Sequence, residues 1–368
     1  MTVAKGAVVT EINKPVEIQE IEWTDDLTDY EVGVRLLSCG LCHSDYHVVN
    51  GELQIGLPAI IGHEGTGIVE RVGKRVTFLK PGDHVVTCFV PPCGKCPSCI
   101  AGQGHLCDWI NPGGGRKDGT YRNINRKGQH VGQLGDLGAL SEYIICTEAA
   151  CIKVDNDLDL NKIPIVGCRV PTGWGSVINL AQAKPGSTAL VIGLGGVGFN
   201  VLQGLKTAGA VVIIAADIHD KKKWAMEWGA THYIDASKQD IVEETMKITG
   251  IGVDTAYECV GDPALQDITV RAIRKTGKAV WVGIVPNNME HKHAFDTWIF
   301  SHYQKTIIGS LYGGASPFQT VPQLLNMYRA AKIKLPELIT KEYKLSQINE
   351  AYADMLAGKL IAGVIRLQ

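Results

Sequence analysis

Cysteines are concentrated in residues 88–108, which read CFVPPCGKCPSCIAGQGHLCD and hold five of the chain's eleven cysteines. Cys93, Cys96, Cys99 and Cys107 follow the pattern CxxCxxCx7C. Thiolates two residues apart can bind one ion at about 2.3 Å, and four of them close a tetrahedral zinc shell. The spacing therefore predicts a structural zinc in a lobe of about residues 88–110, ahead of an iron–sulfur cluster or disulfides. Cys88 is expected to be a small buried apolar residue outside this shell.

Two other segments carry metal-ligand side chains. Cys42 is followed by Ser44, Asp45 and His47, so three polar groups lie close in sequence to one thiol. His63 and Glu64 lie between glycines in GHEGTG. Cysteine and histidine with an adjacent acid are the residue types of a catalytic zinc site, although any one of them is more often a core or surface residue.

A glycine-rich motif predicts a dinucleotide site. The segment ALVIGLGGVGFNVLQGLK places Gly193, Gly195 and Gly198 as GxGxxG between an apolar strand and a helix, with Gly196 and Val197 inside the motif. The glycines permit a tight turn, backbone approach to a pyrophosphate and helix–strand packing.

Asp217 ends the next apolar run, nineteen residues after Gly198, where an acid accepts hydrogen bonds from the adenosine ribose. An acid there repels a 2′-phosphate, so the sequence favours NAD over NADP.

The surrounding elements divide the chain. Residues 33–37, 65–73 and 82–90 are short β-type runs separated by Gly and Pro, which predicts a mostly β domain over 1–169. From about Thr172, buried apolar runs alternate with amphipathic helices, the pattern of a doubly wound parallel sheet. We expect this Rossmann cofactor domain over 170–311. Residues 312–368, two helical stretches and a short β run, are assigned to the first domain.

The composition of the chain argues against several classes of protein. The chain has 36 Lys and Arg against 38 Asp and Glu, a net charge of −2, without the basic excess of a nucleic-acid-binding protein. No apolar run approaches the roughly 18 residues of a membrane span, and residues 1–18 do not resemble a secretory signal. Eleven cysteines in this setting favour reduced thiols and metal ligands. We expect a cytoplasmic protein with neither nucleic-acid nor membrane partners.

Six motifs in order carry a family resemblance: GLCHSDYH, GHEGTGIVERVG, PGDHVV, CGKCPSCIAGQGHLC, GCRVPTGWGSV and GLGGVG. The chain resembles the zinc-dependent medium-chain alcohol dehydrogenases from about residue 5 to 366. VGQLGDLGALSEY and TGWGSVINLA further resemble the actinobacterial nicotinoprotein branch, in which NAD(H) stays bound and an NDMA-type acceptor reoxidises it. The resemblance implies a GroES-like catalytic domain beside the Rossmann domain, and two zinc ions per subunit.

The resemblance also implies roles for individual residues. Cys42, His63 and Cys168 would bind the catalytic zinc, with Asp45 orienting His63 and Glu64 adjusting the coordination. The Cys93, Cys96, Cys99 and Cys107 lobe would hold the structural zinc. Thr172 would contact the nicotinamide, Lys222 the adenosine ribose, and Arg366 the pyrophosphate.

The implied reaction is hydride transfer between NAD(H) and a hydrophobic primary or secondary alcohol and its carbonyl product. Zinc would lower the pKa of the alcohol, and the proton would leave through Ser44, the cofactor ribose and His47. Ser44 as a helix cap and His47 as a surface residue remain alternative interpretations. A zinc-lacking reductase of C=C or imine bonds and a non-enzymatic NAD-binding protein also remain alternative functions.

We expect a homo-oligomer, either a dimer or a tetramer. The long segment 109–143 favours the dimer.

Overall fold

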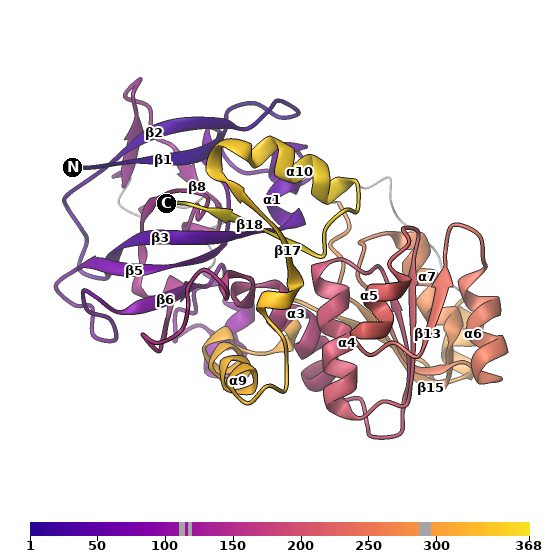
Figure 1. Ribbon diagram of the computed structural model, residues 1–368. Coiled ribbons are helices and arrows are strands. Elements are labelled where there is room, and N and C mark those ends of the chain that lie inside the picture. The colour runs from indigo at the N-terminus through magenta and orange to yellow at the C-terminus, as the bar shows by residue number, and fades with distance from the viewer. Residues whose placement is uncertain (110–114, 117–119, 287–295) are drawn as a thin grey trace. The chain divides into compact units, whose positions relative to one another are not determined.

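The computed structural model describes residues 1–109, 115–116, 120–286 and 296–368, drawn as a ribbon in Figure 1. The chain forms two compact units, one of Met1–Cys168 with Ser316–Gln368 and one of Arg169–Ala315. Residue 110 of the predicted zinc lobe, and residues 110–114 and 117–119 of the long segment after it, lie outside the described residues.

The first unit is mostly β, as the short β-type runs predicted. Its strands form two sheets, in the orders β7-β2-β1-β4-β8 and β10-β6-β5-β3-β18-β17, with β9 also paired to β3. The strands are β1 (Thr2–Val9), β2 (Glu17–Trp23), β3 (Glu31–Leu41), β4 (Ala59–Ile60), β5 (Glu64–Val72), β6 (His84–Thr87), β7 (Asn123–Asn125), β8 (Gly132–Gln133), β9 (Tyr143–Thr147), β10 (Cys151–Val154), β17 (Ile339–Lys344) and β18 (Ala362–Arg366). Its α-helices are α1 (His43–Val49), α2 (Pro97–Ile100), α9 (Pro317–Arg329) and α10 (Ile348–Leu356).

Strand β3 is the centre of this unit. It pairs with β5, β9 and β18, and Val32, Val34 and Leu36 are fully buried in the apolar core. Val and Leu on a strand covered on both sides bury apolar area at about 25 cal/mol per Å². The C-terminal strand β18 lies beside β3 in Figure 1, so the last residues of the chain support the strand that ends next to Cys42.

The second unit is a doubly wound parallel sheet, which confirms the predicted fold class. Its strand order, β13-β12-β11-β14-β15-β16, corresponds to 3-2-1-4-5-6 of dinucleotide-binding folds. The strands are β11 (Thr188–Ile192), β12 (Val212–Asp217), β13 (His232–Asp235), β14 (Val253–Glu258), β15 (Ile273–Trp281) and β16 (Thr306–Gly309). The helices are α3 (Arg169–Gly175), α4 (Gly196–Ala208), α5 (Lys222–Glu227), α6 (Ile241–Thr249), α7 (Pro263–Ala272) and α8 (Thr297–His302).

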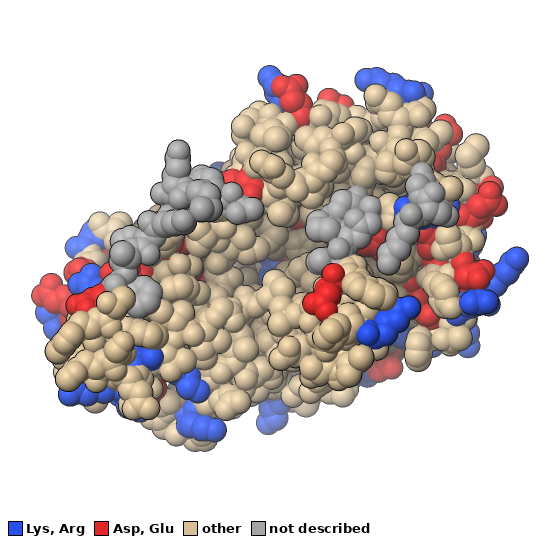
Figure 2. All heavy atoms as spheres, turned by 180° about the vertical axis from the view of Figure 1, so that it is seen from behind, with Lys and Arg blue, Asp and Glu red and all other residues tan. Residues whose placement is uncertain are grey.

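Charged side chains of both signs are interspersed on one face of the molecule. On the face drawn in Figure 2, Lys and Arg lie among Asp and Glu rather than in one basic patch. This distribution agrees with the net charge of −2 and differs from the basic face of a nucleic-acid-binding protein. Within the described residues, none of the helices combines the length and the apolar character that a membrane crossing requires.

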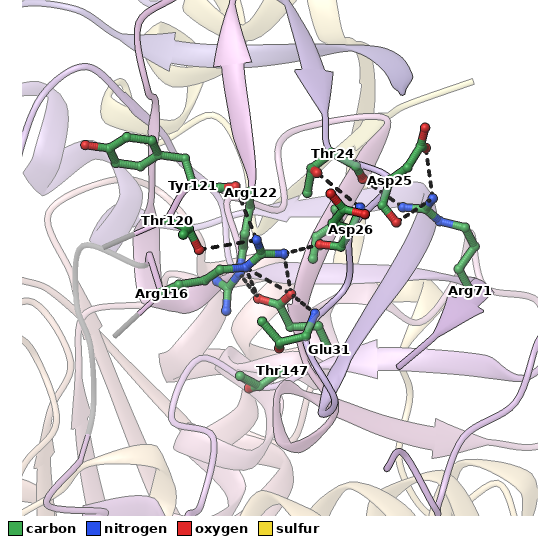
Figure 3. Close-up of polar contacts among 12 residues, drawn as sticks. Thr24, Asp25, Asp26, Glu31, Arg71, Arg116, Thr120, Tyr121, Arg122 and Thr147 are labelled. Carbon is green, nitrogen blue, oxygen red and sulfur yellow. Dashed lines mark hydrogen bonds and ion pairs between the residues drawn. The ribbon is translucent and has the colours of Figure 1, made fainter. Parts of the chain in front are cut away.

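A buried ion-pair network fixes the start of β3. The Glu31 carboxylate accepts hydrogen bonds from Arg116 Nη2 and from Arg122 Nε, both at 2.7 Å, and Arg122 also pairs with Asp136. Figure 3 shows both guanidinium groups pointing at Glu31. Burial alone would raise the pKa of Glu31, but the hydrogen bond from Arg116 and the charge of Arg122 lower it below its usual value.

We expect Arg122→Met to destabilise the first unit by about 3 kcal/mol, because Glu31 and Asp136 would keep buried charges without this partner. Arg126 pairs with Glu20 at the exposed surface, so Arg126→Met should change the stability by less than about 1 kcal/mol. Urea unfolding followed by circular dichroism compares the two variants. Equal stabilities would contradict the importance of the network.

The lowered pKa of Glu31 also predicts how this contribution depends on pH. The ionised carboxylate is favoured by folding, so the stabilisation is fully present above the ordinary glutamate pKa and is lost as the pH falls through the lowered one. The stability difference between the unmodified protein and Arg122→Met should therefore shrink on acidification.

Candidate metal and cofactor sites

Four potential metal ligands from three separate segments meet in the first unit. The ligand atoms of Cys42, His63, Glu64 and Cys168 all lie within 4.8 Å of one another. Cys42 follows β3 and precedes α1, His63 and Glu64 open β5, and Cys168 follows a short 3-10 helix, Pro164–Gly167. The antiparallel register pairs Gly40 with Glu64, which brings the end of β3 next to the start of β5. The structure thus assembles residues that lie up to 126 positions apart, from Cys42 to Cys168.

Asp45 orients the imidazole of His63. Its fully buried carboxylate accepts hydrogen bonds from His63 Nδ1 at 2.7 Å and from the Gly62 N–H at 3.1 Å, both through Oδ1. With Nδ1 bonded to a carboxylate, Nε2 is left to bind a metal. Burial would lower the pKa of His63, but the negative charges of Asp45 and Cys42 raise it well above its usual value. The surroundings therefore favour a positive charge near this imidazole, whether a proton or a metal ion.

Two glycines leave room for the cluster. A Cβ on Gly40 would lie 2.0 Å from Glu64 Oε2, and a Cβ on Gly62 would lie 2.3 Å from the backbone nitrogen of Leu140. Gly62 also has a φ of +97°, in the region that glycine adopts without a steric penalty. The Glu64 carboxylate is completely buried. Any larger residue at position 40 would displace it from the cluster.

The polar residues of α1 extend from the cluster. The Cys42 thiol lies 3.7 Å from the Ser44 hydroxyl oxygen. One turn further, His47 pairs through Nδ1 with Glu52, and its ring centroid lies 4.9 Å from that of His43. The pairing with Glu52 was not predicted, since an acid five residues from a histidine carries no distinctive sequence signal.

The four lobe cysteines also converge on one point. The ligand atoms of Cys93, Cys96, Cys99 and Cys107 lie within 4.8 Å of one another, and the sulfur atoms are 4.0 Å apart in the pairs Cys93–Cys99 and Cys96–Cys107. A tetrahedron with Zn–S bonds of about 2.3 Å has edges of roughly 3.8 Å.

Backbone groups also prepare these thiols for a metal. The N–H groups of Cys96 and Cys99 donate to the sulfurs of Cys93 and Cys96 at 3.3 and 3.4 Å. Backbone hydrogen bonds, the largest from Lys95, lower the pKa of the Cys93 thiol, whereas burial raises the pKa of the Cys99 and Cys107 thiols. Because metal ions bind thiolates, the geometry and the hydrogen bonds both suit one tetrahedral ion.

The glycine-rich turn in the second unit has an open backbone. Gly193 has a φ of +88°, and a Cβ on Gly198 would lie 1.9 Å from the Gly193 carbonyl oxygen. A Cβ on Gly195 would meet no atom within 4 Å, so the peptide there is accessible to a ligand. Gly196 and Val197 begin α4, whose first N–H groups can bind an anion.

Asp217 lies beside this turn, at the end of β12. Its Oδ2 accepts a hydrogen bond from the Leu194 N–H at 2.7 Å. Lys222 is exposed at the start of α5, whereas the adjacent Lys221 is buried and its Nζ lies 3.7 Å from Asp217 Oδ2. Sequence reasoning missed Lys221, because three consecutive lysines give no indication of which one is buried.

The structure places the remaining predicted residues as follows. Thr172 lies in α3, where its carbonyl accepts a hydrogen bond from the Ser176 hydroxyl at 2.6 Å. Arg366 ends β18 in the first unit, where it pairs with Glu342 and donates to the Asn161 carbonyl at 2.6 Å.

Two family models match the chain. The model described as alcohol dehydrogenase GroES-like domain matches residues 28–156, and the one described as zinc-binding dehydrogenase matches residues 196–329. Among curated proteins, alcohol dehydrogenase B of Mycobacterium tuberculosis (strain ATCC 25618 / H37Rv) is 39% identical over 372 residues, which cover 98% of each chain. NDMA-dependent alcohol dehydrogenase of Amycolatopsis methanolica is 39% identical over 367 residues, also covering 98% of both.

Solved structures agree over the whole chain. An alcohol dehydrogenase zinc-binding domain protein from Burkholderia ambifaria has a TM-score of 0.94 at 33% identity, covering 100% of this chain and 99% of that one. Benzyl alcohol dehydrogenase from Acinetobacter calcoaceticus has a TM-score of 0.93 at 30% identity, covering both chains completely. The predicted resemblance and the GroES-like assignment are thereby confirmed.

Proposed function

Because the chain belongs to the family of zinc-dependent alcohol dehydrogenases, we propose that it transfers hydride between NAD(H) and a hydrophobic alcohol/aldehyde pair at a catalytic zinc. The single observation that carries this proposal is the convergence of Cys42, His63, Glu64 and Cys168 within 4.8 Å. A reductase without zinc would have no need for two thiols, an imidazole and a buried carboxylate at one point.

The donor set suits zinc. Two thiolates and one imidazole are ligands that zinc prefers, and three protein ligands leave a fourth position open. Asp45 completes the arrangement by fixing the His63 tautomer, a carboxylate–histidine pairing typical of metal sites. When bound, zinc supplies Lewis acidity, which makes an alcohol hydroxyl more acidic. Glu64, buried next to His63, supplies the acidic neighbour that adjusts the ligand set.

The residues of α1 are suited to moving the proton. Ser44 lies beside the Cys42 thiol, so its hydroxyl would be the first protein group to take up the proton that the alcohol gives up. His47 has a partly exposed imidazole held by Glu52, and an imidazole ring can both accept and donate a proton through its two nitrogens. We assign Ser44 and His47 to the two protein positions of the relay, with the cofactor ribose between them.

The cofactor and the second metal are assigned to the other sites. The turn Gly193–Gly198 would hold the pyrophosphate, and Asp217 would accept hydrogen bonds from the adenosine ribose of NAD. Thr172, Lys222 and Arg366 are further proposed cofactor contacts. The lobe cysteines would bind a structural zinc, because four thiolates leave no position for a substrate.

The proposed setting is a cytoplasmic homo-oligomer, a dimer or tetramer, acting on a small-molecule alcohol. The family assignment supports the small-molecule alcohol as substrate.

Metal analysis combined with an alcohol panel tests the proposal. We expect two zinc ions per chain, and NADH formation at 340 nm with benzyl alcohol and longer linear primary alcohols. Because one relative is NDMA-dependent by name, each alcohol is also assayed with NDMA as the acceptor. Two zinc ions with turnover in either assay would support the proposal. Fewer than two zinc ions, or no turnover in both assays, would contradict it.

A further inference from the structure

A cavity of about 360 Å³ lies in the second unit, at the edge where the strands of the parallel sheet begin. Its wall consists of residues 181–187, which lead into β11, together with the first residues of β14 and of β15. The glycine-rich turn follows the other end of β11, so the cavity lies at the opposite edge of the sheet from the proposed dinucleotide site. Cavities of roughly 300 Å³ or more are large enough for a small organic ligand.

An irregularity in β15 builds one side of the cavity. Between two successive pairs of the ladder, β14 runs from residue 253 to 255, whereas β15 runs from residue 273 to 278. The three additional residues of β15 form a bulge. Arg274 lies in this bulge and the pairing resumes at Lys278, and both residues line the cavity. The bulge therefore places two cationic side chains at one site.

Positive side chains outnumber negative ones in the wall. Lys184, Arg274 and Lys278 line the cavity together with one acid, Asp254. Asp254 Oδ2 accepts hydrogen bonds from the Thr188 N–H and hydroxyl at 2.7 and 2.9 Å, and Oδ1 accepts one from Arg274 Nε at 2.7 Å. Burial alone would raise the pKa of Asp254, but these hydrogen bonds lower it below its usual value. The acid is thus ionised and already bound, and the wall keeps an excess of two positive charges.

The wall also offers hydrogen-bond donors to a ligand. The half-buried Lys278 donates from Nζ to the Ala181 carbonyl at 2.7 Å, which leaves further N–H groups on its ammonium. Lys184 is exposed. Ser187 is only 9% exposed, and its hydroxyl has no hydrogen-bond partner among the described residues. Because buried hydroxyls are ordinarily hydrogen-bonded, Ser187 indicates a polar partner that the chain itself does not provide.

We propose that this cavity binds a small phosphate monoester. A phosphate group carries about two negative charges at neutral pH and three acceptor oxygens, which match the excess charge and the donors of Lys184, Lys278 and Ser187. The side chains of Ala183 and Pro185 add apolar surface to the wall for the organic part of the ligand. A monocarboxylate would neutralise only one of the two excess charges. The inference goes beyond the proposed hydride transfer and does not depend on it.

Calorimetric titration with glycerol 3-phosphate tests the site in phosphate-free buffer at an ionic strength of about 0.15 M. We expect a Kd below about 1 mM for the unmodified protein. Glycerol, which lacks the phosphate, should show no measurable binding. Acetate, with a single negative charge, should bind at least about tenfold more weakly than glycerol 3-phosphate.

Two lysine variants locate the bound phosphate. Lys278→Met should raise the Kd of glycerol 3-phosphate roughly tenfold, through loss of one charge-assisted hydrogen bond. Lys184→Met should raise it about threefold, because an exposed charge is screened by solvent. Since Lys184 is exposed, this second variant keeps the test valid if Lys278→Met does not fold.

Lys275→Met is the matched control. Lys275 follows Arg274 in the bulge and is exposed, but its Nζ lies over the Tyr303 ring, 4.9 Å from the centroid, and it is not among the residues of the wall. Its replacement removes the same charge from the same segment and should change the Kd by less than about twofold.

Three results would overturn the inference. Absence of glycerol 3-phosphate binding in the unmodified protein excludes the site. Binding that neither Lys278→Met nor Lys184→Met weakens, or that Lys275→Met weakens equally, places the phosphate elsewhere, for example at the glycine-rich turn. Acetate binding as tight as that of glycerol 3-phosphate excludes phosphate as the recognised group. Alcohol turnover is not part of this test, so the proposed function stands or fails separately.

Discussion

Replacing Cys42 with alanine is expected to lower alcohol-dependent turnover by about 10³-fold or more. The Lewis acidity of a catalytic zinc contributes several kcal/mol to such a reaction, and each 1.4 kcal/mol is about tenfold in rate. Cys42 is one of the two thiols in its cluster, so its loss removes one of the three ligands assigned to the catalytic zinc. Turnover is measured with saturating alcohol, and zinc by mass spectrometry of the same preparation.

Cys39→Ala is the matched control for Cys42→Ala. Cys39 lies three residues earlier in β3, is completely buried, and its thiol contacts the Gly40 carbonyl. Its loss should lower the stability by about 1 kcal/mol and leave two zinc ions and the turnover in place. If Cys42→Ala retains turnover, the catalytic centre is not at this cluster.

Cys96→Ala is expected to cost stability instead of chemistry. Cys96 is buried, caps α2 by accepting the Cys99 N–H, and lies 4.0 Å from the Cys107 sulfur. Without it the lobe should lose its zinc, leaving one per chain. The melting temperature should fall by roughly 5–10 °C. A structural zinc contributes several kcal/mol to the free energy of unfolding, and each kcal/mol lost lowers the melting temperature by about 2–4 °C. Turnover at 20 °C should stay close to that of the unmodified protein.

Cys88→Ala is the control that distinguishes loss of a zinc ligand from loss of any buried cysteine near the lobe. Cys88 precedes the lobe, is fully buried and contacts the Val90 carbonyl through its thiol. Its replacement should retain both zinc ions and lower the melting temperature by only about 2–4 °C. A large loss of turnover in Cys96→Ala at unchanged stability would contradict the structural role of the lobe.

Local sequence patterns predicted much of the fold. The apolar runs at 188–193 and 211–218 became β11 and β12, and the amphipathic stretch between them became α4. These elements depend on the periodicity of apolar residues and on the positions of glycines, which can be recognised in a short stretch of sequence. The lobe spacing was equally local, because its four cysteines lie within fifteen residues.

Long-range contacts could not be derived in this way. The Glu31 carboxylate meets Arg116 and Arg122, which are 85 and 91 positions away. No periodicity links such residues, and the ion pairs exist only once β3 is packed. Cys168 likewise reaches Cys42 and His63 because a 3-10 helix ends beside the paired strands β3 and β5. Family resemblance, not spacing, placed Cys168 in the prediction.

The sequence by itself determined which segments of the two units form strands and which form helices. It also determined the glycine-rich turn and the family. These follow from residue period, glycine conformation and ordered motifs, all of which are local or compositional. The tertiary structure decided which polar groups meet: Asp45 with His63, Glu52 with His47, and Lys221 rather than Lys222 with Asp217. The physical reason is that the register of the strands and the residue at which each helix begins set the direction of each side chain. Register and helix position are fixed only when distant segments pack together.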